Sequence, residues 1–274
     1  MSCMDLWGIA GIAYLSCLAG CTPAPTDTAA VTSPITHGTT DEGHPAVTAL
    51  LRKGKVVCTG VLVGRHTVLT AAHCISDGPV TSVAFGSDPH FGSSVNVSRV
   101  TVHPQFELAT LRNDIAALEL GAPGPEPLPW LFDSVLMTTL RGSSVDVVGF
   151  GRTAPFDGSP SMKRSGTALV SEIGAETISL APAASTTCFK DSGGPALVKL
   201  DREYVVGIAS HGDSLCEFSS VHSRVDIHRE FIERRLLEAS IEHGCSLPGK
   251  VDRPNGSLLV VLAVLGYRRR RTFR

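Results

Sequence analysis

The sequence is short of charge. Of its 274 residues, 18% are Asp, Glu, Lys or Arg, and the formal net charge is −2 at pH 7. No basic stripe runs through the middle of the chain, which argues against a nucleic-acid partner. A hydrophobic content of 43% with so few charges also argues against a disordered chain. The length suits one two-lobed domain or two small domains, with enough chain to bury a core.

Helical periodicity is scarce as well. Between residues 35 and 224, short valine-rich runs are bounded by Gly, Ser, Asp and Pro, which is typical of an all-β sandwich or barrel. These runs include Val56–Val63, Thr67–Leu69, Val95–Val102, Val145–Val148, Ala168–Ile173 and Tyr204–Ala209. A helical pattern appears only over Val225–His243, with Gly244 after it. The Gly- and Pro-rich stretch Gly121–Pro129 is predicted to connect two β lobes.

The apolar run near the N-terminus is too short to span a bilayer comfortably. It covers Leu6–Gly20 and is typical of the hydrophobic region of a signal peptide, although no Lys or Arg precedes it. Its end, Leu18–Cys21, resembles a bacterial lipoprotein processing box, which implies lipidation of Cys21; an ordinary signal peptide that contains this cysteine is the alternative. We therefore assign residues 1–21 to the signal peptide and residues 22–34, rich in Thr, Pro and Ala, to a propeptide or tether.

The C-terminal segment has its own order of features. A cysteine motif at Gly244–Ser246 is followed by the apolar run Leu258–Leu265 and then by Arg268–Arg271. This order resembles the sorting tails of myxobacterial and related surface proteins, and the arginines would stay cytoplasmic. Residues 244–274 are therefore predicted to be a sorting tail, with a frayed basic tail as the alternative. Both ends together predict an exported bacterial protein that is secreted or held at the cell envelope or outer surface.

The cysteines are few in the middle of the chain. Besides those in the leader (Cys3, Cys17 and Cys21) and Cys245 near the tail, the chain has Cys58, Cys74, Cys188 and Cys216. These last four cysteines fit two disulfides in an exported protein, because their number is even. Buried free thiols are the alternative. The histidines show no metal-ligand spacing, so we expect no metal site and no cofactor.

Three local motifs stand out within the β-rich region. They are Leu69-Thr70-Ala71-Ala72-His73-Cys74, Asn113-Asp114-Ile115-Ala116-Ala117-Leu118 and Asp191-Ser192-Gly193-Gly194-Pro195. Singly, they are compatible with a structural histidine, a capped turn and a surface turn. Together, in the order His, Asp, Ser, they resemble the trypsin/chymotrypsin family of serine proteases. The resemblance covers residues 35–243 and implies two packed six-stranded antiparallel β-barrels with a C-terminal α-helix.

The resemblance implies a serine endopeptidase acting on proteins or peptides. His73 would take the proton of Ser192 and Asp114 would fix the tautomer of His73, because an unassisted serine hydroxyl is a poor nucleophile. Backbone N–H groups of Lys190 and Ser192 would form the oxyanion hole. Lys190 stands where the family usually has glycine, so its side chain would crowd the leaving-group side.

Further positions follow from the same resemblance. Cleavage before Ile35 would free an ammonium that pairs with Asp191, so the protein is expected to be a zymogen. Pro34 stands where a Lys or Arg usually precedes the cut, which implies a different activating protease or a different cut. The expected disulfides are Cys58–Cys74 and Cys188–Cys216.

The expected substrate pocket carries no charge at its base. Thr186 occupies that base with Thr187 beside it, and Ser220 occupies a wall position, so a small or medium uncharged side chain is favoured. The strand Ser210–His211–Gly212 would bind the substrate backbone; His211 is either a flat wall or a residue that favours an acidic substrate. Asp213 is interpreted as a solvated loop charge. The rival hypotheses are a catalytically weak or inactive homologue that acts as a surface binding or regulatory protein, and an esterase.

Overall fold

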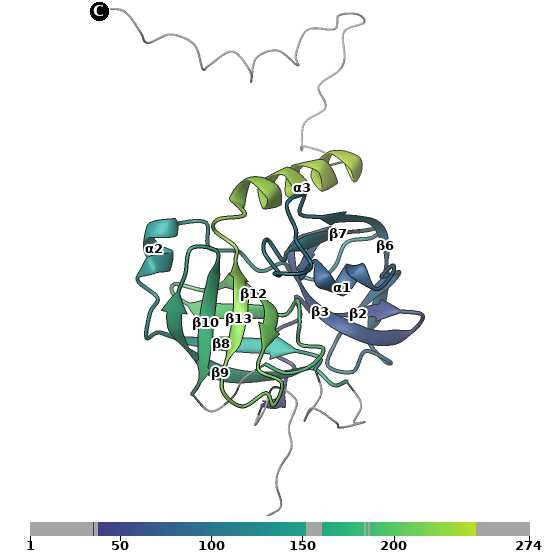
Figure 1. The fold of residues 1–274 in the computed structure, drawn as a ribbon. Helices are drawn as coiled ribbons and strands as arrows, with labels where there is room; N and C mark the ends of the chain where they lie inside the picture. The colour runs from purple at the N-terminus through teal and green to yellow at the C-terminus, as the bar shows by residue number, and fades with distance from the viewer. Residues whose placement is uncertain (1–34, 36–37, 152–160, 184, 186, 245–274) are drawn as a thin grey trace, which may run out of the picture. The chain divides into compact units, whose positions relative to one another are not determined.

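A computed structural model describes residues 35, 38–151, 161–183, 185 and 187–244. Strands are the main secondary structure, and a helix ends the described chain (Figure 1). The strands are β1 (Thr39–Thr40), β2 (Val47–Arg52), β3 (Lys55–Gly64), β4 (Thr67–Thr70), β5 (Ser82–Phe85), β6 (Ser93–Val102), β7 (Ala116–Leu120), β8 (Ser144–Gly149), β9 (Arg164–Ile173), β10 (Thr177–Pro182), β11 (Pro195–Lys199), β12 (Glu203–Gly212) and β13 (Ser220–Arg224). The helices are α1 (His73–Ser76), α2 (Ser134–Thr138) and α3 (Arg229–Glu242). Each of the six valine-rich runs lies within a strand, as predicted.

The first half of the described chain forms a closed antiparallel barrel. Its strands are hydrogen-bonded in the order β2-β3-β4-β7-β6-β5. In β2, Leu50 belongs to an apolar cluster within this barrel, whereas its neighbour Ala49 belongs to a cluster that also contains Val147 and Ile208 of the other half. Both faces of β2 are thus covered, which explains its continuous apolar run where alternation would mark a strand with one solvated face.

The second half forms a second closed ring. The strands run in the order β9-β10-β13-β12-β11-β8, pairing of β8 with β9 closes the ring, and β1 adds to the edge of β9. The predicted fold of two packed six-stranded antiparallel barrels is confirmed. The chain passes from the first barrel to the second between β7 and β8, where the Gly- and Pro-rich stretch lies.

The C-terminal helix α3 is shorter than predicted. It begins at Arg229, after His228 at its N-cap, and not at Val225. Although it follows the second barrel, α3 packs on strands of the first. A Cβ atom on Gly64 would lie 2.4 Å from Leu236 Cδ2, so a larger residue at this position would have to displace the leucine side chain of the helix. This helix therefore fastens the two barrels to each other.

The predicted signal peptide, the propeptide and residues 245–274 of the sorting tail lie outside the described residues. The boundaries that we assign to these segments and to the residue 35–243 domain stay predictions. Within the described residues, no helix is both long enough and apolar enough to cross a membrane.

Candidate active site

His73 and Asp114 make a two-point contact. His73 opens α1 directly after β4, and Asp114 lies just before β7, the strand that pairs with β4. The backbone N–H of His73 donates to Asp114 Oδ1 at 2.9 Å, and Nδ1 of the ring lies 2.7 Å from Oδ2. An ionised carboxylate only accepts, so Nδ1 carries the proton and Nε2 is left as an acceptor.

Asp114 is fully buried and has a third donor. The hydroxyl of Ser210, in β12 of the second barrel, donates to Asp114 Oδ2 at 2.5 Å. Burial raises the pKa of Asp114, but hydrogen bonds and charge from His73 and the hydrogen bond from Ser210 outweigh it and hold the pKa below its ordinary value. The carboxylate is therefore ionised at neutral pH.

Ser192 lies in a tight turn that precedes β11. The N–H of Gly193 donates to the carbonyl of Ala209 at 2.7 Å, and the carbonyl of Ser192 accepts from the N–H of Thr59 at 2.9 Å. Gly193 has a φ of +84°, and a Cβ there would lie 2.1 Å from Thr70 Oγ1 and 2.2 Å from the carbonyl oxygen of Thr59. Glycine is thus required at this point, because only it fits both the backbone conformation and the contact with the first barrel.

Residues from both barrels line one cavity of about 540 Å³. His73 and Ser192 both line it, and so do four of the predicted substrate-binding residues: Thr187, Ser210, His211 and Gly212. Ser220 is not among the described lining residues; it is fully buried in β13, and its hydroxyl lies 3.2 Å from His222 Nε2. Thr186, the predicted base, lies outside the described residues.

Lys190 adopts an uncommon backbone conformation two residues before Ser192. Its φ is +75°, in the left-handed region that favours glycine. The hydroxyl of Thr59 donates to its carbonyl at 3.0 Å, and its ammonium lies 3.5 Å from the hydroxyl of Ser161. A side chain at this φ costs about 1 kcal/mol, and the surrounding contacts hold the turn in place despite that cost.

Asp191, the residue before Ser192, is also buried. Its carboxylate accepts from the N–H of Gly151 at 2.7 Å and of Cys188 at 2.9 Å, and from the backbone of Ile35, which is itself fully buried. Burial raises the pKa of Asp191 to about 7, and these hydrogen bonds lower it in part. The structure thus brings the two predicted activation residues together.

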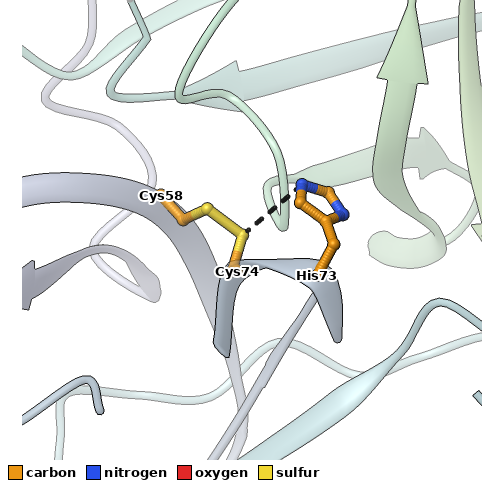
Figure 2. A group of neighbouring side chains, drawn as sticks. All are labelled: Cys58, His73 and Cys74. Atoms are coloured by element: carbon orange, nitrogen blue, oxygen red, sulfur yellow. Dashed lines mark hydrogen bonds between the residues drawn. A yellow bond between two sulfur atoms is a disulfide. The ribbon is translucent and has the colours of Figure 1, made fainter. Parts of the chain in front are cut away.

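Disulfides join Cys58 to Cys74 and Cys188 to Cys216. Figure 2 shows the first beside the ring of His73, with Cys74 Sγ 3.9 Å from Nε2. Cys58, His73 and Cys74 are the one group of described residues with metal-ligand spacing. Their sulfurs are bonded to each other and offer no thiolate, so this cluster does not suit a metal ion.

Asp213 lies in the loop after β12 and is partly exposed, as expected of a loop charge, but it also has a role that its sequence position did not indicate. Its carboxylate accepts from the backbone N–H groups of Leu215, Glu217, Phe218 and Ser219 at 2.8–3.2 Å. It thereby folds residues 213–219 into a compact turn at the cavity wall. Some other contributors carried no local sequence signal: Ser223 behind Asp114, and Leu108 and Leu111 at the cavity.

Comparison with known proteins shows the family of the chain. The trypsin family model matches residues 35–232. Human Serine protease 56 is 27% identical over 226 residues, which cover 72% of this chain and 37% of that protein. Trypsin iota of Drosophila melanogaster is 29% identical over 196 residues, which cover 64% of this chain and 77% of that protein. The Vitellin-degrading protease of Bombyx mori is 26% identical over 225 residues, which cover 73% of this chain and 83% of that protein. The chain therefore belongs to the trypsin-like serine protease family.

Proposed function

We propose that the protein is a serine endopeptidase with Ser192, His73 and Asp114 as its catalytic triad. The observation that carries the proposal is the two-point contact of His73 with buried Asp114, in a cavity that Ser192 also lines. Membership of the family supports the same class of reaction.

The first step forms an acyl-enzyme. His73 Nε2 accepts the proton of the Ser192 hydroxyl as Oγ attacks the peptide carbonyl carbon, and the electron pair of the C=O bond moves to oxygen. The imidazolium so formed is stabilised by ionised Asp114. His73 then gives the proton to the amine nitrogen, the oxyanion re-forms the C=O bond, and the C–N bond breaks to release the amine. A water molecule repeats the sequence on the acyl-enzyme, which releases the acid and restores Ser192.

The oxyanion that develops on the carbonyl needs hydrogen-bond donors. We assign this role to the backbone N–H groups of Ser192 and Lys190. Among the described residues the N–H of Ser192 donates to no protein acceptor, so it is available to a ligand. Each such donor is worth about 10²–10³ in rate.

The protein is also proposed to be a zymogen. After cleavage of the Pro34–Ile35 bond, the new ammonium of Ile35 would replace the amide N–H that now faces Asp191, and a charge pair would replace a neutral hydrogen bond. Since Asp191 precedes Ser192 directly, that pair would stabilise the turn that carries the nucleophile. Proline before the cut argues for an activating protease without trypsin-like preference.

The primary pocket is proposed to take a small or medium uncharged side chain. Two acidic residues, Asp77 and Asp213, line the described part of the cavity. Because the oxygens of Asp213 are occupied by four backbone N–H groups, that residue is a poor partner for a substrate Lys or Arg. Thr187 offers a neutral hydroxyl instead.

The location is proposed from sequence patterns alone. Export by residues 1–21, lipidation at Cys21 and anchoring by residues 244–274 would hold the enzyme at a bacterial cell envelope or release it after cleavage. Intact mass of the mature protein tests all three, since an acylated Cys21 adds mass and each cleavage removes a defined segment.

A fluorophosphonate probe tests the catalytic proposal. We expect it to label the chain cleaved before Ile35, and Ser192→Ala to abolish labelling. Turnover of a casein substrate separates an active endopeptidase from an esterase. A cleaved, folded chain that neither reacts with the probe nor cleaves protein would contradict the proposal and favour the binding or regulatory role.

A further inference from the structure

Ile35 is held in an unfavourable backbone conformation while the chain is uncut. Its φ is +39°, in the left-handed region that a β-branched residue rarely adopts. Such a conformation persists only where the surrounding contacts impose it. The hydrogen bond to Asp191 and the burial of the Ile35 side chain are one part of that restraint. A second part is the attachment of the residues that follow Ile35 in the chain.

Lys163 attaches residues 38–44, which lead into β2, to other parts of the fold. Its carbonyl accepts from the N–H of Asp41 at 2.9 Å, and its ammonium donates to the carbonyl of His44 at 2.7 Å. Its own N–H donates at 2.7 Å to the carbonyl of Ser87, which lies between β5 and β6 of the first barrel. Lys163 is 1% exposed, so water competes poorly for these hydrogen bonds. Residues 38–44 are thus fixed at a buried point.

A chain of charged groups centred on His44 completes this attachment. Nδ1 of His44 lies 2.7 Å from Asp41 Oδ2, and Nε2 lies 3.4 Å from Oε1 of Glu203, the first residue of β12. Lys163 and Glu42 also carry charge at this place. The hydrogen bond to Asp41 and the charges of Asp41 and Glu203 raise the pKa of His44, while burial acts to lower it. Protonated His44 donates to both carboxylates, whereas the neutral ring can donate to only one of them.

We infer that Asp41, His44 and Lys163 form a latch that limits the access of the activating protease to the Pro34–Ile35 bond. A protease needs an extended stretch of chain, and Ile35 is fully buried, so the bond is cut only after this part of the chain opens. The strain at Ile35 favours opening, and the latch opposes it. The inference rests on the proposed zymogen and names how its activation is regulated.

The latch has a different effect once the bond is cut. Ile35 is then the first residue of the chain, so no preceding carbonyl restricts its φ and the strain is lost. The latch still holds residues 38–44 in place and thereby keeps the new ammonium near Asp191. The same contacts that slow the cut therefore stabilise its product.

The latch is also sensitive to pH. The pKa of His44 in the latched state lies above its ordinary value of 6.5, so protonated His44 makes its full contribution to the latch below pH 6.5. This contribution is lost as the pH rises through the raised pKa, and the open fraction of the uncut chain should increase over that range. Asp191 also titrates near pH 7, so the effect of His44 is measured between chains that both keep Asp191.

Trypsin cleavage of the full chain carrying Pro34→Arg and Ser192→Ala tests the latch. Pro34→Arg makes the bond before Ile35 a trypsin substrate, Ser192→Ala prevents self-cleavage, and mass spectrometry follows the N-terminal fragment. Each rate is divided by the rate for a free peptide of the same local sequence, which removes the pH dependence of trypsin. Adding His44→Gln should raise the rate at pH 6 about tenfold or more, as for the loss of a hydrogen bond between charged groups. It should also reduce the rise in rate between pH 6 and about pH 8.

Two further chains make the comparison specific. Glu203→Gln, at a partly exposed residue, removes one carboxylate and should raise the rate at pH 6 by a smaller factor. His90→Gln, at an exposed position between β5 and β6, is the matched control and should leave the rate unchanged. The same rates and pH profiles in the parent, His44→Gln and Glu203→Gln chains would overturn the latch.

Fluorophosphonate labelling of the Pro34→Arg chain that retains Ser192 separates the proposals. Faster cleavage in the His44→Gln chain, with labelling that appears only after cleavage, would support both the latch and the zymogen. Faster cleavage without any labelling would leave the latch standing and refute the peptidase function. Full labelling before cleavage would refute the zymogen and, with it, the regulatory role of the latch.

Discussion

The backbone of Ile35 donates a hydrogen bond to the buried carboxylate of Asp191 while Ile35 is still joined to Pro34. Two further N–H groups, from Gly151 and Cys188, reach the same carboxylate. In the uncut chain this carboxylate meets neutral donors from these three residues, and burial raises its pKa to about 7.

The first prediction concerns the pH dependence of the uncut chain. The folded pKa of Asp191 lies above the value of 3.8 for an unperturbed Asp, so folding favours its protonated form. Below pH 4 Asp191 makes its full contribution to the free energy of unfolding. This contribution, about 4 kcal/mol, is lost as the pH rises towards 7. Urea unfolding of the Ser192→Ala chain between pH 4.5 and 8 should show this fall in the free energy of unfolding.

The control for this prediction is Asp191→Asn in the same chain, which removes the ionisable group. Its free energy of unfolding should vary less over the same range, and identical pH profiles for the two chains would refute the assignment. Cleavage before Ile35 should also flatten the profile, because the new ammonium stabilises the ionised carboxylate.

The second prediction concerns the space around Asp191. A Cβ on Gly151 would lie 2.3 Å from Asp191 Oδ2, so Gly151→Ala must displace the carboxylate. We expect destabilisation of about 1–3 kcal/mol from overpacking, with a large loss of fluorophosphonate labelling. Gly121→Ala is the matched control, since its Cβ meets nothing nearer than 3.7 Å. Labelling at the normal rate in Gly151→Ala would show that the position of Asp191 does not matter for Ser192.

The third prediction concerns the hydroxyl of Ser210. Ser210→Ala removes one donor from the carboxylate of Asp114, so the pKa of Asp114 should rise towards its ordinary value. Because this hydrogen bond helps to hold the carboxylate against His73, kcat should fall about tenfold, as expected for a hydrogen bond to a charged group. Asp114→Asn, which also imposes the wrong tautomer on His73, should cost about 10⁴ in kcat.

Ser223→Ala is the control for Ser210. The hydroxyl of Ser223 donates at 3.1 Å to the backbone carbonyl of Asp114 and not to its carboxylate. It should therefore leave kcat nearly unchanged. An equal fall of kcat in both variants would mean that packing, and not the hydrogen bond to the carboxylate, makes Ser210 important.

The fourth prediction concerns Asp213 as a positioning residue. The folded pKa of Asp213 is lowered to about 2: burial acts to raise it, and backbone N–H groups of residues 215–219 outweigh that effect. The contribution of Asp213 to the free energy of unfolding is therefore present above pH 4 and is lost as the pH falls towards 2. Asp213→Ala should loosen the cavity wall and raise KM by up to about 10² with a smaller change in kcat.

Asp213→Asn should rescue this defect in part, because an amide oxygen still accepts from some of the N–H groups. Asp201→Ala, at an exposed position in the turn between β11 and β12, is the control and should leave KM unchanged. Normal KM values in Asp213→Ala would mean that the disulfide Cys188–Cys216 holds the wall without the carboxylate.

Local sequence patterns were sufficient to predict much of the fold and of the candidate site. Valine-rich runs between turn residues predicted β-structure because the period and the turn chemistry are read from neighbours in the chain. The start of α3 was placed four residues early, since Val225 and Ile227 fit the helical pattern while residues 225–228 form a turn before the helix. The three motifs that contain His73, Asp114 and Ser192 identified the candidate site by their order in the chain. The even number of cysteines indicated two disulfides.

By itself, then, the sequence determined the strands, the family and the residue types of the candidate triad. Only the tertiary structure decided which groups surround them: Ser210 reaches Asp114 from the other barrel, Gly149 and Gly151 make room for Asp191, and Leu108 and Leu111 line the cavity. The reason is physical. Burial, desolvation and hydrogen bonds between distant segments depend on which surfaces meet when the barrels pack, and no local window of sequence contains that information.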